Sequence, residues 1–284
     1  MRLLAGAAAV LATACAVNNE KSEKLAPSYD GANYSTQSEK VAHGKRVAQI
    51  FQCSSCHGAD YSGTNFGELI PLVTGLWATN ISLTLPKMSD AQLEKLLRTG
   101  AHPSRDEIYL MPSKQTQFLS KPDMGALIAY LRTVQPTGRP TPPPPPDFEK
   151  AVAARLPDDY WRWKPGQART YHSSAEEVAY FATNKAPPVG TSAELIQGRY
   201  VALTVCSACH GAALDGRGED AGGIEAALLY NDAAFNRLLT TSLSRTGKPL
   251  KMEWGFGHEV FPLTGSEKSA VIAYTRALAN SRTR

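Results

Sequence analysis

The sequence has no long apolar run, little excess charge and few cysteines. After the first 15 residues, no stretch approaches the roughly 20 consecutive apolar residues that a membrane-spanning helix needs. The net charge of +4 over 284 residues is small, so it indicates neither nucleic acid nor a strongly acidic partner. Five cysteines occur, and four of them fall in two short motifs. The length suits about two ordinary domains.

Those four cysteines belong to a C-x-x-C-H pattern that occurs twice. The motif residues are Cys53, Cys56 and His57, and then Cys206, Cys209 and His210. Two cysteines three residues apart on one helical turn face the same way, so both can form thioethers to one porphyrin. The histidine that follows lies beneath the ring and can bind iron. We therefore predict two covalently attached c-type haems, with His57 and His210 as iron ligands.

Two other interpretations of a C-x-x-C pair are a redox disulfide and half of a zinc site. A redox pair does not need the histidine, and a zinc site usually has a second C-x-x-C or H-x-H nearby. Neither motif has a second C-x-x-C or an H-x-H close to it, and each motif is followed by a glycine, Gly58 or Gly211. The haem interpretation is favoured at both motifs.

The N-terminus resembles an export signal. Residues 1–15 contain a basic residue, a short apolar run and small residues, which is typical of a signal peptide. Cys15 ends a stretch that resembles a bacterial lipobox, although Ala12 stands where leucine is preferred. An ordinary signal peptide with an incidental cysteine is the alternative. We predict a lipoprotein anchored at Cys15 and facing the periplasm, a compartment that suits c-type haem.

The rest of the chain divides by composition. Residues 16–40 are polar and aperiodic, which predicts a flexible tether. Residues 41–135 and 191–284 each contain one motif and read as helical haem domains. Between them, residues 136–190 begin with a run of five prolines at Pro142–Pro146, which favours a stiff spacer over a recognition motif. The aromatic residues of the remaining linker are expected to pack on the domain surfaces.

Helical periodicity surrounds the first motif. Apolar residues recur at helical spacing from Val41 into Cys53, and further helices are predicted over Asp90–Leu97 and Pro122–Val134. Gly44 lies in the first of these helices, where it could let another helix approach closely.

The second half repeats these landmarks in order. Gly198 leads into Cys206 as Gly44 leads into Cys53, and an Ile-Ala-Tyr triplet lies in each last helix, ending at Tyr130 and Tyr274. A Leu-Leu pair before a Thr-Gly turn also recurs. Matched landmarks in one order indicate an internal duplication. The predicted fold class is all-α, with two tandem haem domains joined by a Pro-rich linker.

The sixth iron ligand determines what each haem can do, because methionine favours electron transfer and an open position permits chemistry. The candidates in the first half are Met88, Met111, Met124, His43 and His102. Met111 is favoured because it lies before a proline in an irregular segment between helices. Met124 is expected in the core.

In the second half, Met252 aligns with Met111 and is the only methionine after Cys206, so it is favoured as the sixth ligand and two histidine–methionine haems are predicted. His258 is its competitor, because two histidines can also hold a haem. A proximal imidazole usually donates its other N–H to a backbone carbonyl. Pro71 is the expected source for His57, and Gly222-Gly223-Ile224 is the corresponding stretch for His210.

These residues resemble class I cytochromes c, over roughly residues 41–135 and 191–281. The stretches Ala78–Ile81, Leu96–Gly100 and Tyr109–Pro112 resemble the cytochrome c subunit of membrane-bound alcohol and aldehyde dehydrogenases. That subunit carries three haem domains, and this chain has two motifs. The resemblance implies electrons taken from a periplasmic dehydrogenase and passed towards the respiratory chain.

Three functions compete on the sequence alone. The first is a dihaem electron carrier, held at a membrane by its lipid, with redox proteins as partners. The second is a dihaem enzyme, of peroxidase or thiosulfate-oxidising type, with catalysis at the second haem. The third is a subunit whose haems connect a larger respiratory complex. The carrier and the subunit are favoured over the enzyme, because no acid–base constellation is evident.

Overall fold

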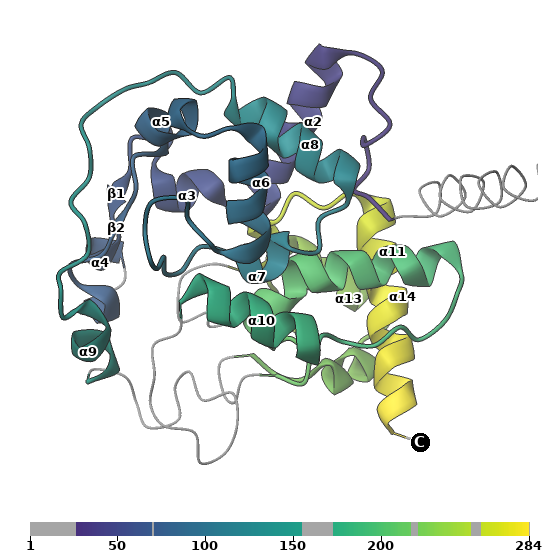
Figure 1. Ribbon diagram of the computed structural model, residues 1–284. Helices are drawn as coiled ribbons and strands as arrows, with labels where there is room; N and C mark the ends of the chain where they lie inside the picture. The colour runs from purple at the N-terminus through teal and green to yellow at the C-terminus, as the bar shows by residue number, and fades with distance from the viewer. Residues whose placement is uncertain (1–26, 70, 155–172, 217–220, 251–256, 284) are drawn as a thin grey trace, which may run out of the picture.

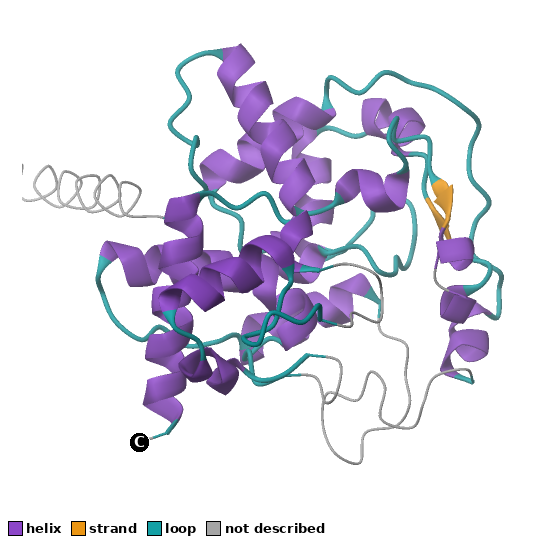
Figure 2. Cartoon of the chain, turned by 180° about the vertical axis from the view of Figure 1, so that it is seen from behind, coloured by secondary structure: helices purple, strands orange, loops and turns teal. Residues whose placement is uncertain are grey.

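The computed structural model describes residues 27–69, 71–154, 173–216, 221–250 and 257–283. Nearly all regular structure in these residues is helical, as Figure 2 shows. Their single sheet pairs β1 (Thr64–Asn65) antiparallel with β2 (Trp77–Ala78). The all-α prediction describes the architecture and misses this short strand pair. No helix of the described residues is long and apolar enough to cross a membrane.

The first half is built on α2 (Gln37–Ile50) and α8 (Lys121–Leu131). Its other helical elements are α3 (Cys53–His57), α4 (Phe66–Leu69), η1 (Pro71–Val73), α5 (Ile81–Thr84), η2 (Leu85–Lys87), α6 (Asp90–Thr99) and α7 (Ser113–Thr116). The three helices predicted from periodicity are present. Ser89 begins α6 with a capping box that includes Gln92, which satisfies amides at the helix start.

Gly44 allows α2 and α8 to cross closely. A Cβ atom built on Gly44 would overlap the carbonyl group of Ala126 and lie 2.9 Å from Cβ of Tyr130. The two helices lie side by side in Figure 1. The predicted role of Gly44 in close packing is confirmed by this contact.

The second half has the same kind of crossing. Its elements are α11 (Ala193–Val201), the π-helical segment η3 (Ala202–Cys206), α12 (Ser207–His210), η4 (Ile224–Leu229), α13 (Asp232–Thr241), η5 (His258–Val260) and α14 (Gly265–Arg282). A Cβ on Gly198 of α11 would overlap the carbonyl of Ala270 on α14 and lie 2.6 Å from Cβ of Tyr274. The glycine, the facing alanine and the tyrosine one turn later therefore recur in both halves.

The two halves share one apolar core, and a residue from the expected tether lies in it. Tyr29 is 1% exposed, its ring centre lies 5.1 Å from that of Tyr200, and its hydroxyl bonds to Thr204 at 2.6 Å. The prediction that residues 16–40 form a flexible tether is therefore wrong for the described part from residue 27 onward. A single aromatic residue that fills an interface provides no periodic pattern by which a sequence could predict it.

Asp123 of α8 joins the same interface through polar contacts. Its buried carboxylate accepts a hydrogen bond from the Tyr29 amide at 2.9 Å and another from the Tyr200 hydroxyl. Its other oxygen lies 2.6 Å from Nε2 of His43. A buried carboxylate with several partners is well compensated for its desolvation. These contacts connect the N-terminal segment, the first half and the second half at one point.

The Pro-rich segment is held against the first half. The Asn80 side chain donates to the carbonyls of Thr137 at 2.7 Å and Arg139 at 3.0 Å. Further on, Pro145 lies against Gly75. The Pro-rich segment 137–147, called the strap below, therefore lies ordered along one side of the first half, because the Asn80 side chain binds its backbone.

The rest of the region from residue 136 to 190 contains two helices. In α9 (Phe148–Ala153), Phe148 and Val152 are buried in a small cluster with Phe66, Val73 and Leu76. Helix α10 (Ser174–Asn184) packs on α7, where Lys114 bonds to Glu177 at 2.5 Å. In Figure 1, α9 lies just below α4, and α10 lies just below α7, which it contacts. The aromatic residues Trp161, Trp163 and Tyr171 lie outside the described residues.

Candidate functional site

The first motif forms its own short helix because the chain turns sharply just before it. Gln52 adopts a left-handed conformation (φ 52°), which ends the run of α2 and starts α3 in a new direction. Gly58 then ends α3 with φ 83°, a value that glycine adopts without strain. The five residues between them carry both cysteines on one turn, as covalent attachment to one porphyrin requires.

Burial raises the pKa values of both thiols of the first motif. The pKa of Cys53 is raised to about 12 and that of Cys56 to about 11, mainly by desolvation. Redox cysteine pairs have a thiolate stabilised at low pKa. The raised pKa values of Cys53 and Cys56 differ from this pattern.

His57 is held by the backbone of the residue after β2. Its Nδ1 lies 2.8 Å from the carbonyl oxygen of Thr79. Since a carbonyl only accepts, Nδ1 carries the hydrogen and Nε2 keeps a lone pair for iron. Burial also lowers the pKa of His57, against the Thr79 hydrogen bond. The expectation that Pro71 supplies this carbonyl is wrong, because the β1–β2 pair brings Thr79 to the ring while Pro71 lies in η1.

The segment that carries Met111 lies against the same surroundings as the motif. Met111 is partly buried in the loop between α6 and α7, and it packs on the main apolar cluster that Cys53 also contacts. Its neighbours Tyr109 and Leu110 pack on the small cluster that Cys56 contacts. The left-handed Leu110 (φ 59°) turns the chain there. This placement is compatible with Met111 as the sixth ligand, which stays a prediction.

The other candidates of the first half have different surroundings. Met124 is 1% exposed, as expected for the core, and Met88 is buried too. His43 is bonded to Asp123. His102 accepts a hydrogen bond at Nδ1 from the Ser104 amide at 3.2 Å in the loop after α6.

The second motif continues from the π-helical segment η3, and its histidine has a backbone partner like that of His57. The Nδ1 atom of His210 lies 2.7 Å from the carbonyl oxygen of Gly222, in the stretch that has no proline to match Pro71. Gly211 has φ 82°, close to the value at Gly58. The backbone carbonyl of His210 accepts from Gly216 at 3.0 Å, as that of His57 accepts from Gly63 at 2.7 Å. Burial raises the pKa of Cys206 to about 12.

The ring of His258 lies near the ring of His210 and is nearly parallel to it. Their centres are 6.2 Å apart and their planes differ by 21°. The Nδ1 atom of His258 is buried and has no hydrogen-bond partner among the described residues. Burial lowers the pKa of His258 to about 4. Its sequence competitor, Met252, lies outside the described residues, as does the predicted anchor at Cys15.

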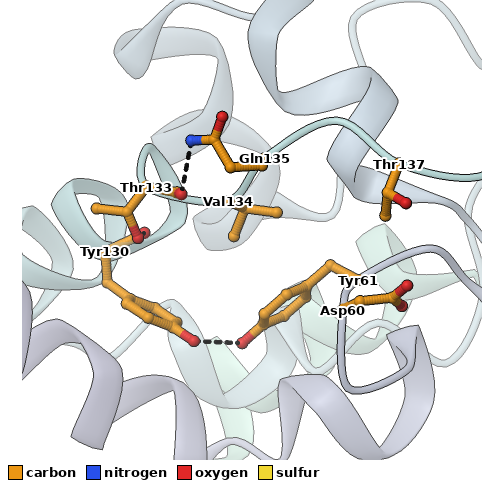
Figure 3. A pocket seen from close by; sticks show the side chains of 7 residues that line it. All are labelled: Asp60, Tyr61, Tyr130, Thr133, Val134, Gln135 and Thr137. Carbon is orange, nitrogen blue, oxygen red and sulfur yellow. Dashed lines mark hydrogen bonds between the residues drawn. The ribbon is translucent and has the colours of Figure 1, made fainter.

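A cavity of about 370 Å³ lies beside the first half (Figure 3). Its lining residues are Asp60, Tyr61, Tyr130, Thr133, Val134, Gln135 and Thr137. The hydroxyls of Tyr61 and Tyr130 meet across it at 3.3 Å. None of the predicted haem-attachment or iron-binding residues lines it, so we assign it no role in haem binding.

Comparison with known families identifies the first half. A family model described as cytochrome c matches residues 41–135, and no curated protein matches the chain. Residues 41–135 are therefore a cytochrome c domain, whose C-x-x-C-H motif implies a covalently attached haem c and is consistent with electron transfer. Among the described residues, no group of three or more His, Cys, Asp or Glu side chains is arranged to hold another metal ion.

Proposed function

We propose that the protein is a dihaem c-type cytochrome that transfers single electrons between a dehydrogenase or respiratory complex and a downstream acceptor. The observation that carries this proposal is the matched orientation of two motif histidines. Each donates its Nδ1–H to a backbone carbonyl, that of Thr79 or that of Gly222. In both halves the motif follows a helix that crosses the last helix at a glycine.

The residues present fit two covalently held haems. The first motif lies in the single helix α3, the second spans the end of η3 and α12, and in each the histidine keeps its Nε2 for iron. A bound haem supplies an iron that gains and loses one electron without further chemistry. The chain's contribution is to fix the imidazole, exclude water with apolar clusters and provide a sixth ligand. In the first half, we assign that sixth ligand to Met111.

The haem count tests this proposal directly. Purified holoprotein should give two haems per chain in a pyridine haemochrome assay, and both should stay with the polypeptide after denaturation. The double variants Cys53→Ser/Cys56→Ser and Cys206→Ser/Cys209→Ser should each retain one. One haem in the wild type, lost only with the first pair, would refute a second haem site.

We further propose that the protein is exported, is lipid-anchored at Cys15 and works on the periplasmic side of a bacterial membrane with redox protein partners. The support is the signal-like N-terminus and its lipobox-like end. Cys15→Ser should move the protein from the membrane fraction to the soluble periplasmic fraction. Equal membrane retention of both forms would contradict the anchor.

Electron transfer is favoured over enzymatic turnover because both motif histidines have candidate partners for the opposite side of the iron. An enzyme needs an open or exchangeable position. Tyr109 and Leu110, the neighbours of Met111, pack on the small apolar cluster that Cys56 also contacts, and the ring centre of His258 lies 6.2 Å from that of His210. A high-spin ferric signal from one haem of the untreated protein would instead support the enzyme alternative at the second haem.

A further inference from the structure

The second motif leaves one question that the sequence cannot resolve, namely which residue lies opposite His210. Sequence alignment favours Met252, whereas the described structure places the His258 imidazole in front of His210. The two rings come from different elements, α12 and η5, more than 40 positions apart in the chain. Their approach is therefore a product of the fold.

The separation of the rings is the one that a shared iron requires. A metal–imidazole bond is about 2.0 Å long, and the ring centre lies about 1.15 Å behind the bonding nitrogen, so two imidazoles on opposite sides of one iron have centres about 6.3 Å apart. The observed separation is 6.2 Å. The planes are nearly parallel, at 21°, which allows both rings to stand upright on the same haem.

The His258 ring also has a buried nitrogen that nothing in the described residues binds. Its buried Nδ1 atom has no hydrogen-bond partner among the described residues, and an unpaired buried polar atom is costly unless something binds it. A neutral imidazole is the form that binds iron.

The loop that carries His258 is fixed from both halves of the molecule. The His258 amide donates to Oγ of Ser242 at 2.6 Å, at the end of α13. Two residues later, the carbonyl of Val260 accepts from Nε2 of Gln52 at 2.8 Å. Gln52 is the left-handed residue that precedes the first motif. A ligand loop held at two points is preorganised, as a metal site requires.

We infer that His258 is the sixth ligand of the second haem, which makes this haem bis-histidine while the first is histidine–methionine. The inference rests on the proposed function, because it requires a haem at the second motif. Methionine ligation raises the reduction potential of a haem. A haem held by His57 and Met111 would therefore take up the first electron, and a haem held by His210 and His258 would supply electrons to it.

The test uses the full-length holoprotein and the absorption band of methionine-ligated ferric haem, near about 700 nm. Met111→Leu should abolish this band completely, and Met252→Leu should leave it unchanged. His258→Ala should convert one haem of two to a high-spin form, which added imidazole returns to low spin. His258→Met should increase the band about twofold. His102→Ala, a loop histidine elsewhere, is the matched control and should change nothing.

The order in which the two haems are reduced provides a second test, and this test uses the wild-type protein. In a potentiometric titration of the wild type, the band near about 700 nm should disappear with the first electron. Two haems per chain with a band that survives Met111→Leu and falls with Met252→Leu would overturn the assignment of His258 and leave the dihaem proposal intact. A single haem per chain would overturn the dihaem proposal itself.

Discussion

The glycine crossings of the two halves lead to a quantitative prediction about stability. In Gly44→Ala, the new methyl group would overlap the carbonyl of Ala126, which belongs to the backbone of α8 and cannot rotate away. The helices must therefore separate or shift along one another. Gly198→Ala meets the carbonyl of Ala270 in the same manner.

The expected cost is the difference of two terms. Replacing a helical glycine by alanine favours the helix by about 1 kcal/mol. Forcing an extra carbon into a close contact costs about 1–3 kcal/mol, and the upper end applies where backbone must move. The net loss is about 1–2 kcal/mol at each site. At about 2–4 °C per kcal/mol, each variant should melt roughly 2–8 °C below the wild type.

The measurement is thermal unfolding of the holoprotein, followed by far-ultraviolet circular dichroism. Gly125→Ala is the matched control, since it lies on α8 next to Ala126 and its nearest neighbour is Cε of Lys40 at 3.9 Å. That variant should melt at or above the wild-type temperature. If Gly44→Ala melts as high as Gly125→Ala, the close crossing does not depend on glycine and the reasoning is wrong.

Three further substitutions test contacts that join separate parts of the chain. Asp123→Ala removes the buried carboxylate at the interface of the halves. The free energy of unfolding, measured by urea denaturation, should fall by about 3–5 kcal/mol. An unchanged denaturation midpoint would contradict the role of Asp123 at this interface. Arg46→Ala leaves the buried Glu267 carboxylate without its cation and should cost about 2–3 kcal/mol in the same assay, whereas a loss below about 0.5 kcal/mol would place this pair among ordinary surface pairs. Asn80→Ala removes two hydrogen bonds to the strap and should speed amide exchange over residues 137–147, with the exchange of α8 as the internal reference.

The helices around the first motif could be predicted from sequence because their signals are local. Apolar spacing and the Ser89 capping box predict α6 without any tertiary knowledge. The attachment residues are equally local, since their chemistry fixes their spacing. Gly44 was identifiable because only a residue without a side chain permits so close a crossing.

The parts that the sequence did not predict depend on backbone atoms and isolated contacts. The partner of His57 is a carbonyl, and every residue has one, so nothing in the sequence distinguishes Thr79 from Pro71. Tyr29 lies in a polar stretch and is ordered by groups about 90 residues or more away. His258 was identified as a competitor, but only the fold places its ring opposite His210.

If the proposed lipid anchor at Cys15 is present, the burial of Tyr29 limits how far the protein can work from a membrane. If Cys15 carries the lipid, the chain between anchor and folded body is the stretch from Ala16 to Tyr29. A fully extended chain of that length spans at most about 50 Å, compared with about 85–90 Å for a tether that ran to residue 40. The haem-binding motifs would therefore stay close to the bilayer surface. They would reach partners embedded in the same membrane but not partners on the far side of a wide periplasm.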